Sequence, residues 1–205
     1  MRNSLRAILA VLLYVCVLAI FGWTQSVESG MLQWCADRPL VWGDFSGPVP
    51  SDAGSSTPAE INIQVQWRIS VVTEYDWGTR GYVSRVDPTS VQVVNLMDCR
   101  GSWCVLSRTS SNTLRHEQGH FDLQEVYCRK LRTALPAISA QASSDSAAKQ
   151  MIQRIIQDTA GSILGMLESM QDRYDRETVH STNVQMQDHW CSQISDWLAH
   201  PEMAP

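Results

Sequence analysis

The chain has 205 residues, of which 44% are apolar and 18% charged, and it contains eight tryptophans. This composition is typical of a folded domain rather than a disordered segment, and the length suits one domain. Sixteen Lys and Arg against 21 Asp and Glu give a net charge of -5, which argues against a partner recognised through a phosphate backbone. We therefore predict one folded domain and no nucleic-acid partner.

The first residues have the layout of an export signal. Arg2 and Arg6 precede an unbroken apolar run over residues 7–21, and residues 7–23 are just long enough to cross a bilayer. No clear small-residue cleavage site follows. We therefore predict that residues 1–26 are a signal peptide or an N-terminal membrane anchor built on residues 7–23, and that residues 27–205 form a single domain that is periplasmic or secreted.

The cysteines of the exported part are odd in number, in a compartment that favours disulfides. Cys99 and Cys104 flank four residues that include Gly101, a connection short enough for a hairpin whose ends reach disulfide distance. We therefore predict a Cys99–Cys104 disulfide. The sequence does not decide how the other three pair: Cys35, Cys128 and Cys191.

The part of the chain before residue 108 has the pattern of β-structure. A loop rich in Ser, Gly and Pro over residues 46–58 is followed by apolar residues at every second position from Ile61 to Val71, which predicts one long, half-buried strand. Shorter strands are predicted after it, and together they indicate an antiparallel meander: Gly81–Val86, Val91–Met97 and Trp103–Leu106.

Beyond residue 108 the apolar period becomes helical. A first helix is predicted over residues 113–135, with N-caps available at residues 110–112 and Pro136 ending it. A second helix of about thirty residues follows the Ser-rich residues 143–146, and a third follows Thr182 or Asn183. The predicted fold class is α+β and zincin-like, with a small, mostly antiparallel sheet followed by three helices.

Residues 116–120 read HEQGH within the first predicted helix. Residues i and i+4 lie on one helix face, so His116 and His120 can present two imidazoles to one Zn²⁺ ion. Glu117 lies one step around the helix, from where its carboxylate can take a proton from a water molecule. The alternative is that both histidines are ordinary helix-surface residues.

A third ligand has to come from elsewhere in the chain, and the segment YDRETVH at residues 174–180 is rich in suitable groups. We favour His180, with Glu177 and Asp175 as alternatives because zinc also accepts carboxylates. Tyr174 is a candidate to donate a hydrogen bond to a developing oxyanion, although a half-buried residue at a helix end is the commoner role for such a tyrosine.

Two further features have structural and functional interpretations. Asp122 could fix the N–H of a ligand imidazole, or form a salt bridge or backbone contact. Trp42, Asp44 and Phe45 could form one wall of a cleft, but we favour a role in pinning the N-terminal segment onto the sheet.

These motifs, in their order along the chain, resemble an uncharacterised bacterial family described as predicted secreted zinc-dependent proteases. The resemblance rests on LVWGDFSGPVP at 40–50, SW at 102–103, RHEQGHFDLQEVYCRKLR at 115–132 and YDRETVH at 174–180. In that family the HEQGHFD and YDxxTxH blocks carry the proposed active site. The resemblance therefore implies a site made of His116, Glu117, His120 and His180, supported by Asp175 and Thr178.

The expected activity is metal-assisted hydrolysis, with a peptide or protein of the cell envelope as the substrate. In this interpretation His116, His120 and His180 hold Zn²⁺ and Glu117 is the general base. The alternative is a non-catalytic envelope binding or assembly protein that has a structural or vestigial metal site. A structural zinc site is closed by four protein ligands, whereas the sequence offers three.

Overall fold

A computed structural model describes residues 30–54 and 57–205. The predicted signal peptide or membrane anchor at residues 1–26 lies outside this range. Within the described residues, no helix combines the length and the apolar composition needed to cross a membrane.

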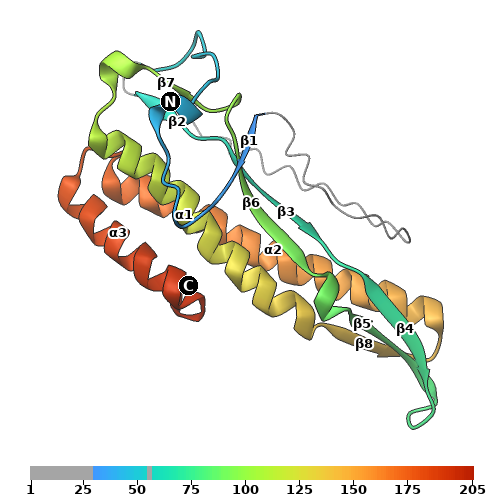
Figure 1. Cartoon of the computed structure of the whole chain (residues 1–205). Coiled ribbons are helices and arrows are strands. Elements are labelled where there is room, and N and C mark those ends of the chain that lie inside the picture. The colour runs from blue at the N-terminus through green and yellow to red at the C-terminus, as the bar shows by residue number, and fades with distance from the viewer. Residues whose placement is uncertain (1–29, 55–56) are drawn as a thin grey trace.

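In the described part of the chain, eight short strands form three antiparallel sheets (Figure 1). The first sheet has the order β1-β6-β3, the second pairs β2 with β7, and the third has the order β4-β5-β8. The strands are β1 (Met31–Gln33), β2 (Ala59–Glu60), β3 (Ile63–Arg68), β4 (Val71–Asp76), β5 (Gly81–Val86), β6 (Gln92–Asp98), β7 (Trp103–Cys104) and β8 (Ser139–Ala142).

Three long helices follow most of the strands: α1 (Ser111–Ala134), α2 (Asp145–Thr178) and α3 (Val184–Ala199). Each begins where a polar side chain can accept a hydrogen bond from a free backbone N–H of the first turn. Ser110 accepts from Thr113 N, Ser144 from Ala147 N and Asn183 from Met186 N. The predicted bounds of the three helices are confirmed to within a few residues.

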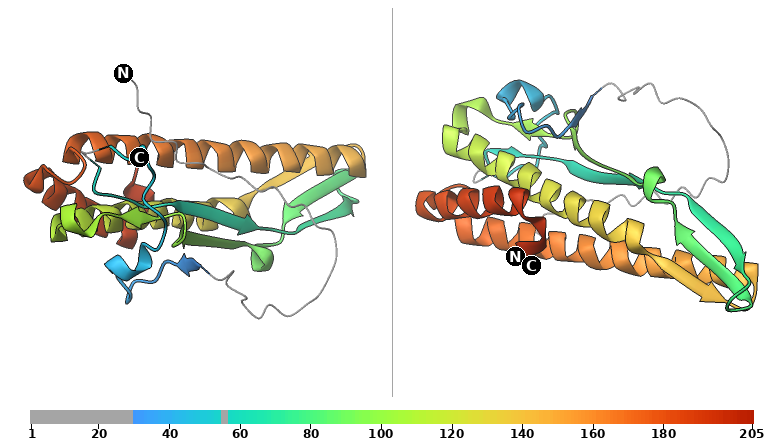
Figure 2. Two further views of the ribbon diagram at one scale, coloured as in Figure 1. Left: turned by 90° about the horizontal axis from the view of Figure 1, so that it is seen from above. Right: turned by 60° about the horizontal axis from the view of Figure 1, so that its bottom comes forward.

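The helices lie side by side, with the strands along one side of them (Figures 1 and 2). The helix α2 runs almost the whole length of the molecule, and α1 packs against both α2 and α3. The main core lies between α1, α2 and α3 and includes the fully buried side chains of Leu131, Ile152 and Trp190. The packing therefore holds the N-terminal half of α1 close to the C-terminal end of α2.

The α+β class is confirmed, but the predicted strand from Ile61 to Val71 is wrong as a single element. The chain pairs with β6 as far as Arg68 and then with β5 from Val71 onwards. At the change of partner, Ser70 bonds to the loop between β5 and β6, with its carbonyl accepting from Asp87 N. The two-residue period continues through this change because it reports which face is buried and not which strand is the neighbour.

The predicted meander is also wrong. Among the strands of the described residues, only β4 and β5 are consecutive and paired in one sheet, whereas β6 lies between β1 and β3. The strands β1, β2 and β8 are too short to give a clear pattern in the sequence. All pairings in the described residues are antiparallel, as predicted.

The predicted Cys99–Cys104 disulfide is not formed. All cysteines of the described residues are free thiols, with Cys35 exposed and Cys128 buried. After β6 the chain turns at residues 99–102, where Ser102 N donates to Asp98 O, and β7 then pairs with β2 instead of returning along β6. Cys99 and Cys104 are therefore not the two ends of a hairpin.

Candidate functional site

The two motif histidines lie on the face of α1 that is turned towards the end of α2. His116 and His120 are one helical turn apart, and their ring centroids are 4.6 Å apart with the planes at 83°. Both side chains are buried, at 4% and 8% exposure. The helical period therefore places the two imidazoles together, as the HEQGH motif predicts.

Asp175, near the C-terminal end of α2, completes a group of three donor atoms. Its Oδ1 lies 3.0 Å from His116 Nε2 and 2.9 Å from His120 Nε2, and the two Nε2 atoms are 3.1 Å apart. Bonds of about 2.0–2.1 Å to a tetrahedral zinc ion would place such donors about 3.4 Å apart. The three atoms therefore have nearly the spacing that a shared metal ion requires.

Two glutamines fix which nitrogen of each imidazole faces this group. Gln171 Nε2 donates to the carbonyl of His120, so its Oε1 is the atom that accepts from His120 Nδ1, at 2.6 Å. Gln187 Nε2 donates to the hydroxyl of Tyr174, so its Oε1 accepts from His116 Nδ1, at 3.2 Å. In its neutral form each imidazole therefore carries its proton on Nδ1 and turns the lone pair of Nε2 towards Asp175.

The charges in this group are strongly coupled. Burial lowers the pKa of His120, but the charge and hydrogen bond of Asp175 outweigh burial and raise it to about 9. Burial also lowers the pKa of His116. Burial acts to raise the pKa of Asp175, but the two histidines hold it well below its usual range. Without a metal ion, the negative charge of Asp175 is thus balanced by the extra proton on His120. A metal cation can replace this proton.

Glu117 is buried next to this group but faces the strands. Its Oε2 accepts a hydrogen bond of 3.1 Å from the backbone N–H of Ile61, between β2 and β3. Burial raises its pKa to about 7, and the nearby charge of Asp175 acts in the same direction. A carboxylate with a pKa near neutrality is suited to accept and return a proton.

Tyr174 lies behind His116. Its ring stacks on the imidazole with centroids 4.7 Å apart and planes at 12°, and its hydroxyl donates to the carbonyl of His116 at 3.2 Å. The tyrosine is completely buried rather than half-buried. It therefore supports the position of His116.

His180 lies beside the group but outside it. Its Nδ1 is 3.5 Å from Asp175 Oδ1, and its side chain is 58% exposed. The group with donor atoms all within 4.8 Å of one another contains His116, His120 and Asp175. His180 lies in a turn in which Val179, His180 and Ser181 all have positive φ, at 50°, 47° and 75°. Residues other than glycine rarely adopt this left-handed backbone conformation, and β-branched residues such as Val179 adopt it least often.

The other predicted residues have structural partners. Glu177 pairs with Arg173 and accepts from Trp190 Nε1, which keeps it away from the donor group. Asp122 accepts from Trp34 Nε1 and Gln118 Nε2 rather than from a ligand imidazole.

The N-terminal segment is pinned in the way that we favoured. Asp44 pairs with Arg38, and Phe45 packs in a small core with Leu40, with Met97 of the sheet strand β6 and with Phe121 of α1.

Sequence reasoning missed the two glutamines. Gln171 lies one turn before Asp175 on the same face of α2, so its spacing from a candidate ligand was a usable signal. Gln187 comes from α3, and nothing in its local sequence indicates that it reaches His116.

The comparison with protein families gave a match that covers residues 44–181. The matching family is described as "Bacterial protein of unknown function (DUF922)". This range contains all three residues of the donor group, His116 and His120 on α1 and Asp175 on α2. Neither the comparison with curated proteins nor that with solved structures gave a match.

Proposed function

The chain belongs to the DUF922 family of bacterial proteins of unknown function, and from the geometry of its site we propose that it is a zinc-dependent hydrolase. The proposed ligands are His116, His120 and Asp175, and the proposed general base is Glu117. Asp175 replaces His180, our first choice from the sequence, because its carboxylate lies within 3.0 Å of both imidazole nitrogens.

The observation that supports this proposal best is that three donor atoms converge. Their charge partners within the group are histidines, which can lose a proton, and not Lys or Arg. Two Nε2 atoms and one carboxylate oxygen meet within about 3 Å, and the hydrogen bonds of Gln171 and Gln187 keep both Nε2 atoms turned inwards. Three protein ligands leave one position of a tetrahedral metal ion open, which is the arrangement of catalytic zinc sites.

In the proposed reaction, the residues of the chain would have the following roles. A zinc ion held by the three ligands would supply a Lewis acid that polarises a carbonyl and lowers the pKa of water. Glu117 would take the proton from the attacking water and return it to the leaving group, and its pKa of about 7 suits both steps. Gln171 and Gln187 would keep the imidazoles in the Nδ1–H form.

An amide bond of a peptide or protein is the substrate class that we propose. Within the described residues, β3 is the outer strand of its sheet, so one side of it is unpaired. Ile61, which leads into β3, already points its N–H at Glu117. An extended peptide can add to such an edge through main-chain hydrogen bonds. We further propose that the substrate lies in the cell envelope, because residues 1–26 have the layout of an export signal.

The experiment that tests this proposal compares wild type with Glu117→Gln on a mixed peptide library, with products identified by mass spectrometry. Glu117→Gln keeps the acceptor for Ile61 N–H but cannot take a proton. The rate should fall by about 10²- to 10⁴-fold while zinc content stays the same. The matched control is Glu168→Gln, an exposed residue of α2, which should retain full activity.

Full-rate cleavage by Glu117→Gln would show that this residue is not the base. A wild-type protein that binds one zinc ion per chain but cleaves no peptide would instead favour a binding or assembly protein with a structural metal ion.

A further inference from the structure

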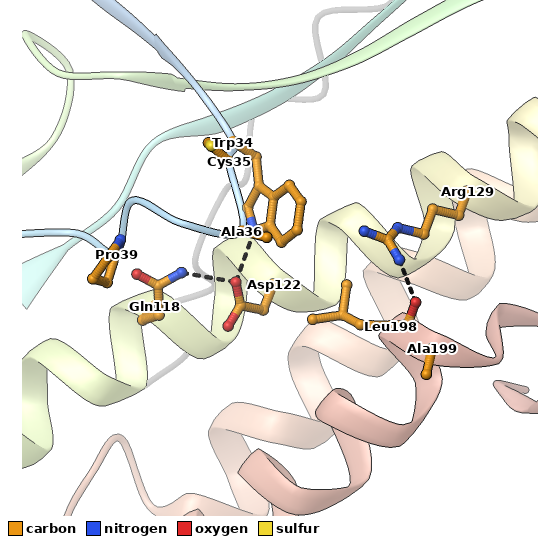
Figure 3. A pocket seen from close by; sticks show the side chains of 9 residues that line it. All are labelled: Trp34, Cys35, Ala36, Pro39, Gln118, Asp122, Arg129, Leu198 and Ala199. Carbon is orange, nitrogen blue, oxygen red and sulfur yellow. Dashed lines mark hydrogen bonds between the residues drawn. The ribbon is translucent and has the colours of Figure 1, made fainter.

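A pocket lies on the side of α1 that faces away from the group of His116, His120 and Asp175. This pocket of about 420 Å³ is lined by residues that follow β1, by α1 and by the end of α3 (Figure 3). Its α1 residues Gln118 and Asp122 come two positions after His116 and His120, which is about 200° around the helix. Pockets of this size hold small molecules or single side chains.

Asp122 is the group in this pocket that needs a partner. Its Oδ1 accepts from Trp34 Nε1 and from Gln118 Nε2, both at 2.7 Å, and both donors are neutral. Its Oδ2 accepts no hydrogen bond from the described residues, and in Figure 3 it is turned away from both donors. The carboxylate therefore has one free oxygen, and no ion pair joins it to any residue described, while burial raises the pKa of its carboxyl group.

The cation of the pocket does not neutralise Asp122. Arg129 pairs at 3.2 Å with Glu125, a carboxylate that it shares with Arg132, and donates to the carbonyl of Leu198. Its guanidinium lies 5.4 Å from the centre of the Trp34 ring. Leu198 and Ala199 at the rim belong to the last turn of α3, where the helix dipole adds negative potential. The free oxygen of Asp122 and the C-terminal end of α3 thus favour a cation in the part of the pocket beside Asp122.

The remaining lining is largely apolar and suits an alkyl chain. The indole of Trp34, the ring of Pro39 and the side chain of Leu198 surround the approach to Asp122. From this combination we propose that the pocket binds a primary ammonium group carried on an alkyl chain, as in a lysine side chain or a free alkylamine. The ammonium would bond to Asp122 Oδ2, and the chain would lie against the apolar walls. This inference is independent of the proposed hydrolase activity.

The test titrates the full-length protein with n-butylammonium and follows binding by ligand-observed NMR, with n-butanol as the uncharged ligand of the same length. Wild type should bind n-butylammonium saturably, and n-butanol should not bind in the same range. Asp122→Asn keeps an acceptor for Trp34 and Gln118 but removes the charge, and it should weaken binding at least tenfold. Asp158→Asn, which removes an exposed charge from α2, should bind as wild type does.

A second pair of variants tests the site without touching the contacts of Asp122. Ala199→Lys places a tethered ammonium at the rim and should weaken binding of n-butylammonium, whereas Ala199→Met, of similar length and uncharged, should weaken it less. Absence of saturable binding in wild type, or equal binding in Asp122→Asn and wild type, would overturn the proposal. A blocked tripeptide with a central lysine shows whether the ammonium group comes from a lysine side chain or from a free alkylamine. If it binds, the pocket takes lysine side chains, and if only n-butylammonium binds, the pocket takes free amines.

Discussion

Gly119 and Tyr174 are in contact across the interface between α1 and α2, in a way that permits no side chain at position 119. A Cβ atom added to Gly119 would lie 2.7 Å from Cζ of Tyr174 and closer still to the hydroxyl oxygen. Tyr174 in turn stacks on His116 and bonds to its carbonyl. The glycine inside HEQGH therefore lets the tyrosine support the first ligand of the proposed metal site.

We expect Gly119→Ala to destabilise the protein. Overpacking of this kind costs about 1–3 kcal/mol, which exceeds the gain of about 1 kcal/mol from alanine's helix propensity. The matched control is Gly161→Ala in α2, where an added Cβ meets nothing within 4 Å and the propensity gain should appear as added stability. Urea unfolding measures both. If both variants gain stability equally, the contact between Gly119 and Tyr174 is not rigid.

The proposed ligand set predicts a pattern of zinc contents. His116→Ala, His120→Ala and Asp175→Asn should each lose stoichiometric zinc, because each removes one of three buried donors. His180→Ala should keep zinc, since its imidazole lies outside the group. Elemental analysis after dialysis decides, with Glu177→Gln as a control at the same end of α2. Retention of zinc by Asp175→Asn together with its loss in His180→Ala would identify the imidazole as the third ligand.

Gln171→Leu should weaken zinc binding without removing a ligand. The substitution removes the acceptor for His120 Nδ1–H, and loss of such an outer contact costs about 10- to 100-fold in metal affinity. Gln157→Leu, at an exposed position of the same helix, is the matched control and should bind zinc as wild type does. Competition with a chelator measures the affinities. An unchanged affinity in Gln171→Leu would mean that the imidazole is oriented by packing alone.

Zinc affinity should increase with pH across the neutral range. In the metal-free protein His120 has a pKa of about 9, so below that pH zinc has to displace a proton from its Nε2. Each unit of pH from 6 to 8 should therefore raise the apparent affinity about tenfold, because one proton is released per ion bound. The measurement is a chelator-buffered titration at several pH values. An affinity that is constant over this range would contradict the coupling between His120 and Asp175.

Much of this protein was determined by local sequence, because helix ends and helix faces depend on residues a few positions apart. Ser110 and Pro136 bound the first helix through the free N–H groups at its start and the missing N–H at its end. The same local geometry places His116 and His120 on one face before any tertiary contact is known. The α+β class follows from the change in apolar period near residue 108.

The tertiary structure alone decided which groups meet. The third donor depends on how the end of α2 packs on α1, and there the positive-φ turn at residues 179–181 leaves His180 outside while Asp175 points inwards. The partner of each strand and the separation of Cys99 from a return strand likewise depend on contacts far apart in the chain. Gln187 reaches His116 from another helix, a relationship that no local pattern records, because the distance between residues 71 positions apart is set only by packing.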